Sequence, residues 1–316
     1  MKIVVTGGAG FIGHYVIKEL LSKGHIVTVA DNLSKDESKV PDDVTFVNVD
    51  LTDKQKTIET FKNHDICINL ASKIGGIGYF NKLPATILSE NNKIYSSTFE
   101  AAVATKIKRM VYVSSSMVFE STNIFPSKES DLDKIPPPVT GYGFSKFIGE
   151  YYCRKFQQEF GLDYTIIRPF NAYGVNEFPG EYIGYSHVIP DLVKKILQGQ
   201  YPLELLGDGQ QTRCFTNVVD LARGIVMATF SDKAINEDFN MGTSTETKMI
   251  DLAKKIWEVM QQEKKFKAKF VEGFKHDIKK RVPDVSKAKE VLDWEQQISF
   301  EKGLKEVVDW LKIEIQ

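Results

Sequence analysis

Two side chains near the middle of the sequence could carry out acid–base chemistry together. Tyr142 and Lys146 are four residues apart in a segment that predicts a helix over 142–160, so they lie on one helix face, about 40° apart. An ordinary tyrosine has a pKa of about 10, which is too high for a base at neutral pH. A neighbouring ammonium group favours the phenolate. Tyr142 is therefore a candidate acid–base group for interconverting a hydroxyl and a carbonyl.

This spacing is a weak signal by itself, because the sequence contains 12 tyrosines. Tyr151 and Lys155 repeat it on the same predicted helix. Nine residues at roughly 100° each place Tyr151 on the face opposite Tyr142, so only one pair can face a common ligand. Tyr142 is the better candidate because it stands at the helix start and follows the serine run 114–116. Tyr151 fits packing or an interface.

The N-terminal segment has the pattern of a phosphate-binding turn. The apolar stretch Lys2–Thr6 predicts a buried strand, and the amphipathic run 11–23 predicts a helix. Gly7, Gly10 and Gly13 follow the strand at intervals of three. Such a turn lets the backbone approach a pyrophosphate, and the helix N-terminus offers free N–H groups.

The second predicted strand, 25–30, is followed by an acid that matches a dinucleotide site. Asp31 lies 18 residues after Gly13. A carboxylate about 20 residues beyond such a turn holds the adenosine ribose. An acid at this position repels a 2′-phosphate, so the sequence predicts NAD in preference to NADP.

Alternating strands and helices in the first half of the chain predict a parallel, doubly wound sheet. Past residue 170 the pattern becomes irregular. We therefore expect an α/β fold, a Rossmann-type doubly wound parallel sheet with a smaller mixed α/β C-terminal substrate lobe. Residues 1–170 plus about 216–239 are expected to bind the cofactor, and about 171–215 and 240–316 to form the lobe.

Residues that follow the strands face the ligand in open α/β sheets. Asp50 follows the predicted strand 44–49 and is placed to accept a hydrogen bond from an adenine amino group. Asp50 or Thr52 could instead cap the next helix, 54–62. The sequence leaves both interpretations open.

The composition argues against several classes of protein. The 316 residues carry a net charge of −1, which disfavours a nucleic-acid-binding surface. The three cysteines lie far apart and lack metal-ligand spacing, so we expect reduced thiols, a cytoplasmic location and no metal site. No apolar run approaches the roughly 20 residues of a membrane helix, and no signal peptide is recognised.

Together these stretches resemble the extended short-chain dehydrogenase/reductase family, in its group of nucleotide-sugar epimerases and dehydratases. The match is mainly to UDP-glucose 4-epimerases, with some features of GDP-fucose synthases. The matching stretches span nearly the whole chain in family order: 6–13 (TGGAGFIG), 31–33 (DNL), 69–71 (NLA), 114–116 (SSS), 142–146 (YGFSK), 168–174 (RPFNAYG), 207–215 (GDGQQTRCF), 219–220 (VD) and 281–284 (RVPD).

The resemblance implies roles by position. The catalytic residues would be Tyr142, Lys146 and Ser115, with Ser116 in place of Ser115 if the alignment slips by one. The NAD-binding residues would be Gly7, Gly10, Phe11, Ile12, Gly13, Asp31, Asn32, Asp50, Leu51, Leu70, Ala71, Ser72, Tyr142, Lys146 and Pro169. The substrate-binding residues would be Ser116, Asn171, His187, Arg213 and Arg281, with both arginines on the phosphates. Without the flanking motifs, surface salt bridges would be the better explanation of these arginines.

Departures from the family pattern favour one activity over others. Family 4,6-dehydratases carry an Asp–Glu pair after the catalytic residue, where this chain has Ser116 and Met117. GDP-fucose synthases and GDP-mannose 3,5-epimerases carry a cysteine at Met117, although the stretches 71–77 and 186–190 resemble the former branch. His187 is then a candidate general acid that protonates a sugar carbon. The alternative is that His187 has only a structural role in its loop.

The resemblance thus implies NAD-dependent epimerisation of a nucleotide-diphosphate sugar at C4 through a 4-keto intermediate. One alternative is a GDP-sugar 3,5-epimerase or 4-keto epimerase/reductase that uses His187. Another is a non-catalytic NAD-binding sensor or scaffold. The family also implies a homodimer through the helices at 84–105 and 142–160. The net charge and the lack of long apolar runs predict no nucleic-acid or membrane partner.

Overall fold

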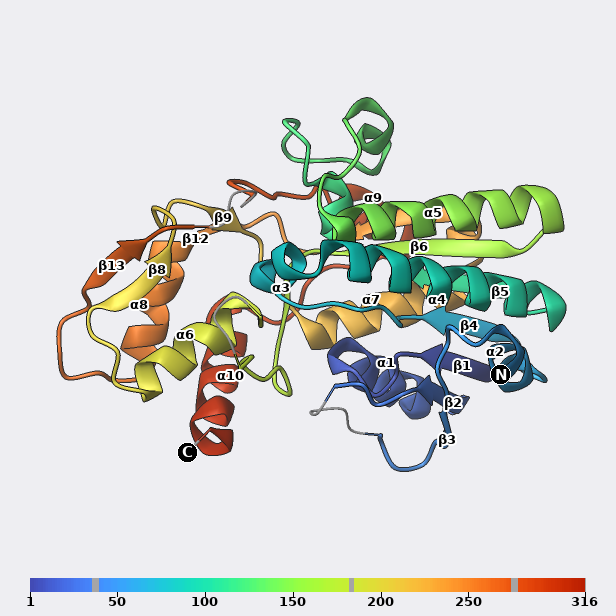
Figure 1. Ribbon diagram of the computed structural model, residues 1–316, viewed down its shortest axis with the longest axis horizontal. Helices are drawn as coiled ribbons and strands as arrows, with labels where there is room; N and C mark the ends of the chain where they lie inside the picture. The colour runs from blue at the N-terminus through green and yellow to red at the C-terminus, as the bar shows by residue number, and fades with distance from the viewer. Residues whose placement is uncertain (36–39, 182–184, 274–277, 316) are drawn as a thin grey trace.

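The computed structural model describes residues 1–35, 40–181, 185–273 and 278–315. Its largest part is a seven-stranded parallel sheet in the order β11-β6-β5-β4-β1-β2-β3 (Figure 1). Its strands are β1 (Lys2–Thr6), β2 (Ile26–Asp31), β3 (Thr45–Asn48), β4 (Ile66–Asn69), β5 (Arg109–Val113), β6 (Asp163–Pro169) and β11 (Glu237–Met241). The strand order reverses at β1, which confirms the predicted Rossmann-type sheet.

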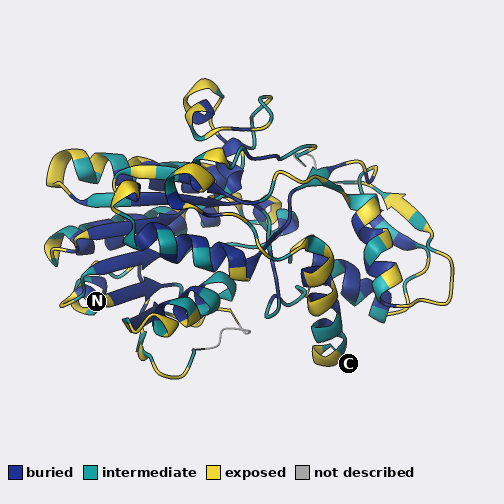
Figure 2. Cartoon of the chain, turned by 180° about the vertical axis from the view of Figure 1, so that it is seen from behind, coloured by how far each residue is buried: buried dark blue, intermediate teal, exposed yellow. Residues whose placement is uncertain are grey.

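Helices cover both faces of this sheet, and the strands between them are buried (Figure 2). One face is covered by α1 (Phe11–Ser22), α7 (Val218–Phe230) and α9 (Ser286–Leu292), and the other by α2 (Lys54–Phe61), α4 (Pro84–Ala104) and α5 (Gly141–Phe160). Side chains alternate between the faces: Val5 joins the core with α1, and Val4 joins the core with α4. None of the helices in the described ranges has both the length and the apolar character of a membrane span.

A second, smaller core lies in the C-terminal lobe, at the left of Figure 1. It is built from α6 (Val188–Leu197), α8 (Met249–Val259), α10 (Phe300–Glu314) and the parallel pair β8 (Leu203–Leu206) and β13 (Ala268–Val271). Two short pairs add to it: β7 (Ala172–Tyr173) with β10 (Thr216–Asn217), and β9 (Thr212–Arg213) with β12 (Thr247–Lys248).

The packing differs from the expected division at two places. β11 extends to Met241 and pairs with β6, although residues from 240 onward were assigned to the lobe. Residues 286–294 also pack on the sheet, because Leu292 and Trp294 enter its core and the Trp294 indole N–H donates to the Asp220 carbonyl at 2.9 Å. The assignment of cofactor and substrate binding to the two parts stays a prediction.

The register of the sheet brings three strand ends together. Thr6 of β1 pairs with Ala30 of β2 and with Asn69 of β4. The segments that follow these strands therefore open at one edge, where the strand order reverses and α/β sheets bind ligands. A short helix, α3 (Ile77–Lys82), lies beyond β4 and begins directly after Gly76.

Candidate active site

A cavity of about 1030 Å³ lies at this edge of the sheet and reaches residues of the lobe. Every residue assigned above to catalysis, cofactor binding or substrate binding lines it. From the sheet come Gly7, Gly10, Phe11, Ile12, Gly13, Asp31, Asn32, Asp50, Leu51, Leu70, Ala71, Ser72, Ser115, Ser116, Tyr142, Lys146 and Pro169, and beyond it come Asn171, His187, Arg213 and Arg281. The predicted roles require these residues to line one cavity. This location does not test the role of any single residue, so the roles remain predictions.

The turn after β1 can pack closely only because it consists of small residues. Gly7 has a φ of +67°, and a Cβ there would lie 2.7 Å from the backbone nitrogen of Ala71. A Cβ on Gly13 would lie 2.6 Å from the Gly7 carbonyl oxygen, so α1 rests directly on the turn. Gly10 is the N-cap of α1 and makes no side-chain cap, which leaves first-turn N–H groups available to an anion.

Asp31 completes this end of the cavity. One carboxylate oxygen accepts the Ala9 N–H at 3.1 Å, and the other accepts the Leu33 N–H at 2.9 Å. These bonds orient the carboxylate and leave further lone pairs for hydroxyl groups. A dinucleotide would meet N–H groups for its pyrophosphate and a carboxylate for its ribose, so these residues fit NAD.

The structure shows which residue caps the helix after β3. The N-cap of α2 is Asp53, whose Oδ1 accepts the Lys56 N–H at 3.1 Å, and not Asp50 or Thr52. The helix starts at Lys54, so only Asp53 has the reach to cap it. Asp50 instead accepts the N–H and O–H of Thr52 at 2.9 and 2.8 Å and lines the cavity.

Tyr142 and Lys146 lie in the first turns of α5. The hydroxyl of Thr140 caps this helix by accepting the Gly143 N–H at 3.0 Å. Tyr142 and Lys146 are each only 3% exposed. Lys146 Nζ donates to the Val113 carbonyl at 2.9 Å and lies 5.9 Å from the centre of the Tyr142 ring. The ammonium group is thus held close to the phenol.

Burial governs the titration of both groups. It raises the pKa of Tyr142 well above its usual value, against a Ser115 hydrogen bond and the Arg281 charge, which lower it. It lowers the pKa of Lys146 to about 7, against the charge of Glu150. In the chain without NAD, desolvation therefore opposes the phenolate, and the expectation that the ammonium favours it stays a prediction.

The predicted substrate residues around Ser115 form one polar group. Ser115 follows β5, and its hydroxyl accepts the Met117 N–H at 3.1 Å. Ser116 is buried, and its hydroxyl accepts from Arg281 Nη1 at 3.1 Å. The same nitrogen lies 3.5 Å from the Asn171 side-chain oxygen. Ser116, Asn171 and Arg281 are thus brought together beside the candidate catalytic serine.

Arg213 belongs to a different segment, the short strand β9. Its Nη1 donates to the carbonyl oxygens of Thr212 and Ile278 at 2.8 and 2.6 Å. It lines the cavity from the lobe, in β9.

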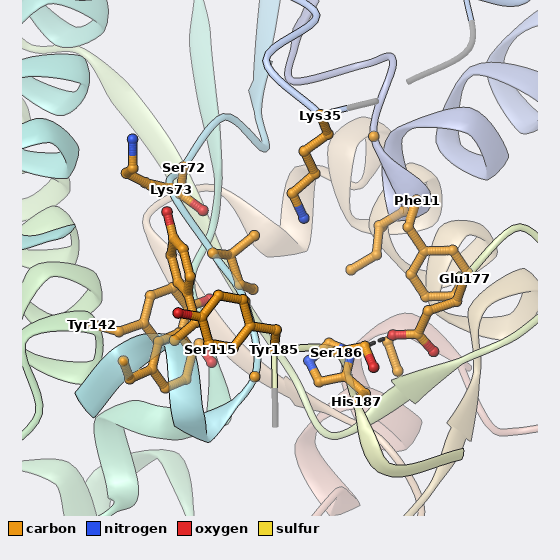
Figure 3. A pocket seen from close by; sticks show the side chains of 18 of the residues that line it. Phe11, Lys35, Ser72, Lys73, Ser115, Tyr142, Glu177, Tyr185, Ser186 and His187 are labelled. Carbon is orange, nitrogen blue, oxygen red and sulfur yellow. Dashed lines mark hydrogen bonds and ion pairs between the residues drawn. The ribbon is translucent and has the colours of Figure 1, made fainter. Parts of the chain in front are cut away.

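His187 is the N-cap of α6 and forms an ion pair with Glu177 through Nδ1. Desolvation lowers the pKa of His187, but the Glu177 carboxylate more than compensates, so the pKa lies above its ordinary value. In the view of Figure 3, Tyr142 with Ser115 and His187 with Glu177 lie on opposite sides of the cavity.

Two residues that shape the cavity are not predicted from the sequence. Phe80 on α3 stacks on Tyr142, with ring centres 4.5 Å apart and planes 6° apart. Glu177 is only 8% exposed and holds His187. Neither contact has a local signal, because Phe80 follows glycines that suggest a loop and Glu177 lies in an irregular segment.

Comparison with known proteins agrees with this geometry. The model of the NAD dependent epimerase/dehydratase family matches residues 3–242. The chain belongs to this family. The epimerase/dehydratase match confirms the predicted NAD dependence and makes the protein an enzyme of the extended short-chain dehydrogenase/reductase type.

Relatives of this epimerase/dehydratase chain differ in activity. The UDP-N-acetyl-alpha-D-glucosaminuronate decarboxylase of Bacillus cytotoxicus is 31% identical over 98% of this chain and 98% of its own length. The UDP-glucuronate 4-epimerase of Thermodesulfobacterium geofontis is 30% identical over 99% and 97%. The crystal structure of Thermotoga maritima UDP-glucose 4-epimerase with UDP-glucose has a TM-score of 0.90, 30% identity and 100% coverage of both chains.

Proposed function

We propose that this enzyme is a nucleotide-sugar 4-epimerase, acting on a UDP-hexose or a derivative of one. The observation that carries the proposal is the convergence of Tyr142, Lys146 and Ser115 on the cavity that also contains the glycine turn. The two residues after Ser115, Ser116 and Met117, have no acidic group. This arrangement supports redox chemistry at one carbon without an acid–base pair for dehydration.

The proposed reaction needs one acid–base group and its supports. When bound, NAD supplies a reversible acceptor for the hydride of the sugar C4. Tyr142 takes the proton of the 4-hydroxyl as the carbonyl forms, and it returns that proton when the carbonyl is reduced on its other face. Lys146 stabilises the phenolate by its charge, and Ser115 hydrogen-bonds the reacting oxygen.

Inversion at C4 requires the 4-keto sugar to turn over inside the site. The cavity of about 1030 Å³ is at the upper end of ordinary ligand sites, which span about 300–1,000 Å³. A cavity of this size suits the large ligands that the proposed reaction needs. Arg281, Ser116 and Asn171 would hold the diphosphate end while the sugar rotates.

Decarboxylation of a nucleotide-linked uronate is a second candidate, favoured by the 31% identity to the Bacillus cytotoxicus decarboxylase. It would begin with the same oxidation at C4. The new ketone is β to the carboxyl group on C5, so the C–C bond electrons can pass to the carbonyl as carbon dioxide leaves. The two candidates thus share Tyr142 and the 4-keto sugar, and they differ in the fate of that ketone.

A 3,5-epimerase or 4-keto epimerase/reductase remains the third outcome. The His187–Glu177 pair supports it, because a histidine held by a carboxylate can act as a general acid that protonates a sugar carbon. Met117 opposes it, since a thioether cannot supply the second acid.

One experiment separates these candidates. The purified enzyme is incubated in heavy water with UDP-, GDP- and dTDP-hexoses and with UDP-uronates, and the products are followed by NMR. We expect a C4 epimer with no solvent deuterium at C3 or C5. Deuterium at C3 or C5 of a product that keeps all its carbons would indicate the His187 chemistry. Loss of the carboxyl carbon, with solvent deuterium taken up at C5, would indicate decarboxylation, and no turnover of any substrate would favour a sensor or scaffold.

A further inference from the structure

An ion pair lies in the interior outside the residues assigned above to the site. Glu150 and Arg168 both have side chains that are 0% exposed. Arg168 Nε donates to one carboxylate oxygen of Glu150 at 2.7 Å, and its Nη2 donates to the other at 2.6 Å. Two parallel hydrogen bonds of this kind fix the mutual orientation of the two groups.

Glu150 connects this pair to the catalytic helix and to the end of β5. It lies one turn after Lys146 on α5 and accepts the Ser114 hydroxyl at 2.7 Å. Lys146 Nζ donates to the Val113 carbonyl at 2.9 Å. Two consecutive residues at the end of β5 are thus each bound by a side chain of α5. This double connection fixes the helix that carries the tyrosine relative to the turn that carries Ser115.

Arg168 extends the network across the sheet. It lies on β6, and its Nη2 also donates to Asp238 of β11 at 2.7 Å. Lys287 donates to the other Asp238 oxygen at 2.9 Å. Arg154 on α5 lies 3.7 Å from the Glu150 carboxylate and 3.8 Å from that of Asp238.

A buried ion pair contributes little net stability in general, because the cost of desolvation offsets the attraction. We propose that Glu150 and Arg168 are positioning residues that hold Lys146 in register with the turn after β5 and favour its charged form. This rests on the proposed function, since the lysine charge matters there only if Tyr142 is the acid–base group.

The surroundings of Lys146 support this role for Glu150. Its Nζ lies 5.7, 5.4 and 5.9 Å from the ring centres of Tyr95, Tyr112 and Tyr142. Burial raises the pKa of each of these phenols, so in the chain without NAD burial opposes a negative charge on any of them. Among the described residues, Glu150 is the group whose charge raises the pKa of Lys146 against burial. Arg168, Arg154 and Asp238 act on Lys146 through Glu150.

The direct test measures the charge of Lys146 without turnover. NMR of protein with isotope-labelled lysine, prepared without NAD, follows the Lys146 ammonium through its titration, with Lys146→Arg identifying the signal. We expect Glu150→Gln to lower the midpoint by about 1 pH unit or more, because Glu150 lies one helix turn from Lys146 and a nearby opposite charge shifts a pKa by about 1–3 units. The alkaline limb of kcat should move to lower pH in parallel.

Two control variants isolate the charge. Glu159→Gln makes the same change at an exposed position of α5 and should leave the midpoint unchanged. Ser114→Ala removes the hydrogen bond to Glu150 but keeps the charge, so the midpoint should also stay in place.

Glu150→Gln leaves the buried Arg168 with one carboxylate fewer. The double variant Glu150→Gln/Arg168→Gln is therefore measured alongside it. It should lower the Lys146 midpoint by less than Glu150→Gln alone, because it also removes a positive charge. An unchanged midpoint in a folded variant overturns the proposal. Loss of folding in both variants also overturns it, since the pair would then act in stability alone. A shifted midpoint in an enzyme that turns over no nucleotide sugar would instead refute the proposed function.

Discussion

The glycine turn after β1 allows stability and cofactor binding to be changed separately. Gly13→Ala would place a Cβ 2.6 Å from the Gly7 carbonyl oxygen, which must retreat by about 0.8 Å to reach an ordinary 3.4 Å contact. The methyl group would be attached to the backbone of α1 and the carbonyl belongs to the backbone of the turn, so neither can rotate away. Overpacking of this kind costs about 3 kcal/mol at the upper end of its range. The gain of about 1 kcal/mol from replacing glycine in a helix offsets part of it.

The net loss for Gly13→Ala is therefore about 2 kcal/mol. For a chain of this size, we expect the Tm of the protein without NAD to fall by about 4 °C. Gly10→Ala is the matched variant, because its Cβ would lie 3.3 Å from the same carbonyl oxygen and needs only a slight adjustment. Its methyl group would stand at the helix N-terminus, between the N–H groups and a bound phosphate.

Thermal unfolding with and without NAD measures both effects. At an NAD concentration of 100 Kd, wild-type protein gains about 2.7 kcal/mol, and a tenfold weaker Kd reduces the gain to about 1.4 kcal/mol. We expect Gly10→Ala to keep the Tm measured without NAD. We expect its stabilisation by NAD to fall to about 1.4 kcal/mol or less. A wild-type Tm for Gly13→Ala, or an undiminished NAD effect for Gly10→Ala, would refute the proposed packing and phosphate site.

Three further predictions concern single contacts. Asp31→Ala should weaken NAD about tenfold, the cost of a lost charged hydrogen bond, while NADP binding improves; fluorescence titration showing an unchanged preference would count against the ribose assignment. Burial lowers the pKa of Lys146 to about 7, so between about pH 7 and 10.5 the unfolded chain holds more protons and stability rises with pH. Lys146→Met should abolish that rise in urea unfolding, and a rise that persists would locate it elsewhere. Gly149→Ala would place a Cβ 2.0 Å from the Tyr112 hydroxyl and should cost about 1–3 kcal/mol; an unaltered urea midpoint would contradict this packing.

Local patterns in the sequence were sufficient to predict the sheet and one end of the cavity. A strand, a glycine turn and a helix start are adjacent in the chain, and parallel pairing then brings Asp31 to the same edge. The same holds for Tyr142 and Lys146, whose relation depends on helix geometry alone.

Features that depend on tertiary packing could not be predicted. The stacking of Phe80 on Tyr142 joins two helices distant in sequence, and the Tyr142 pKa depends on burial that no spacing reveals. The cap of α2 was ambiguous because Asp50, Thr52 and Asp53 are all suitable caps within four residues, and only the exact helix start selects one. The packing of α9 on the sheet likewise depends on Trp294 reaching α7.

The central claim is that Tyr142 exchanges a proton with the sugar while hydride leaves C4 and returns to it. The most direct measurement uses a nucleotide sugar deuterated at C4, chosen from the substrates that the enzyme turns over, with wild-type protein and Tyr142→Phe. We predict that the wild-type epimer retains the deuterium at C4, and that Tyr142→Phe binds NAD but gives no epimer. Loss of the deuterium to solvent, or turnover by Tyr142→Phe at the wild-type rate, would contradict the mechanism.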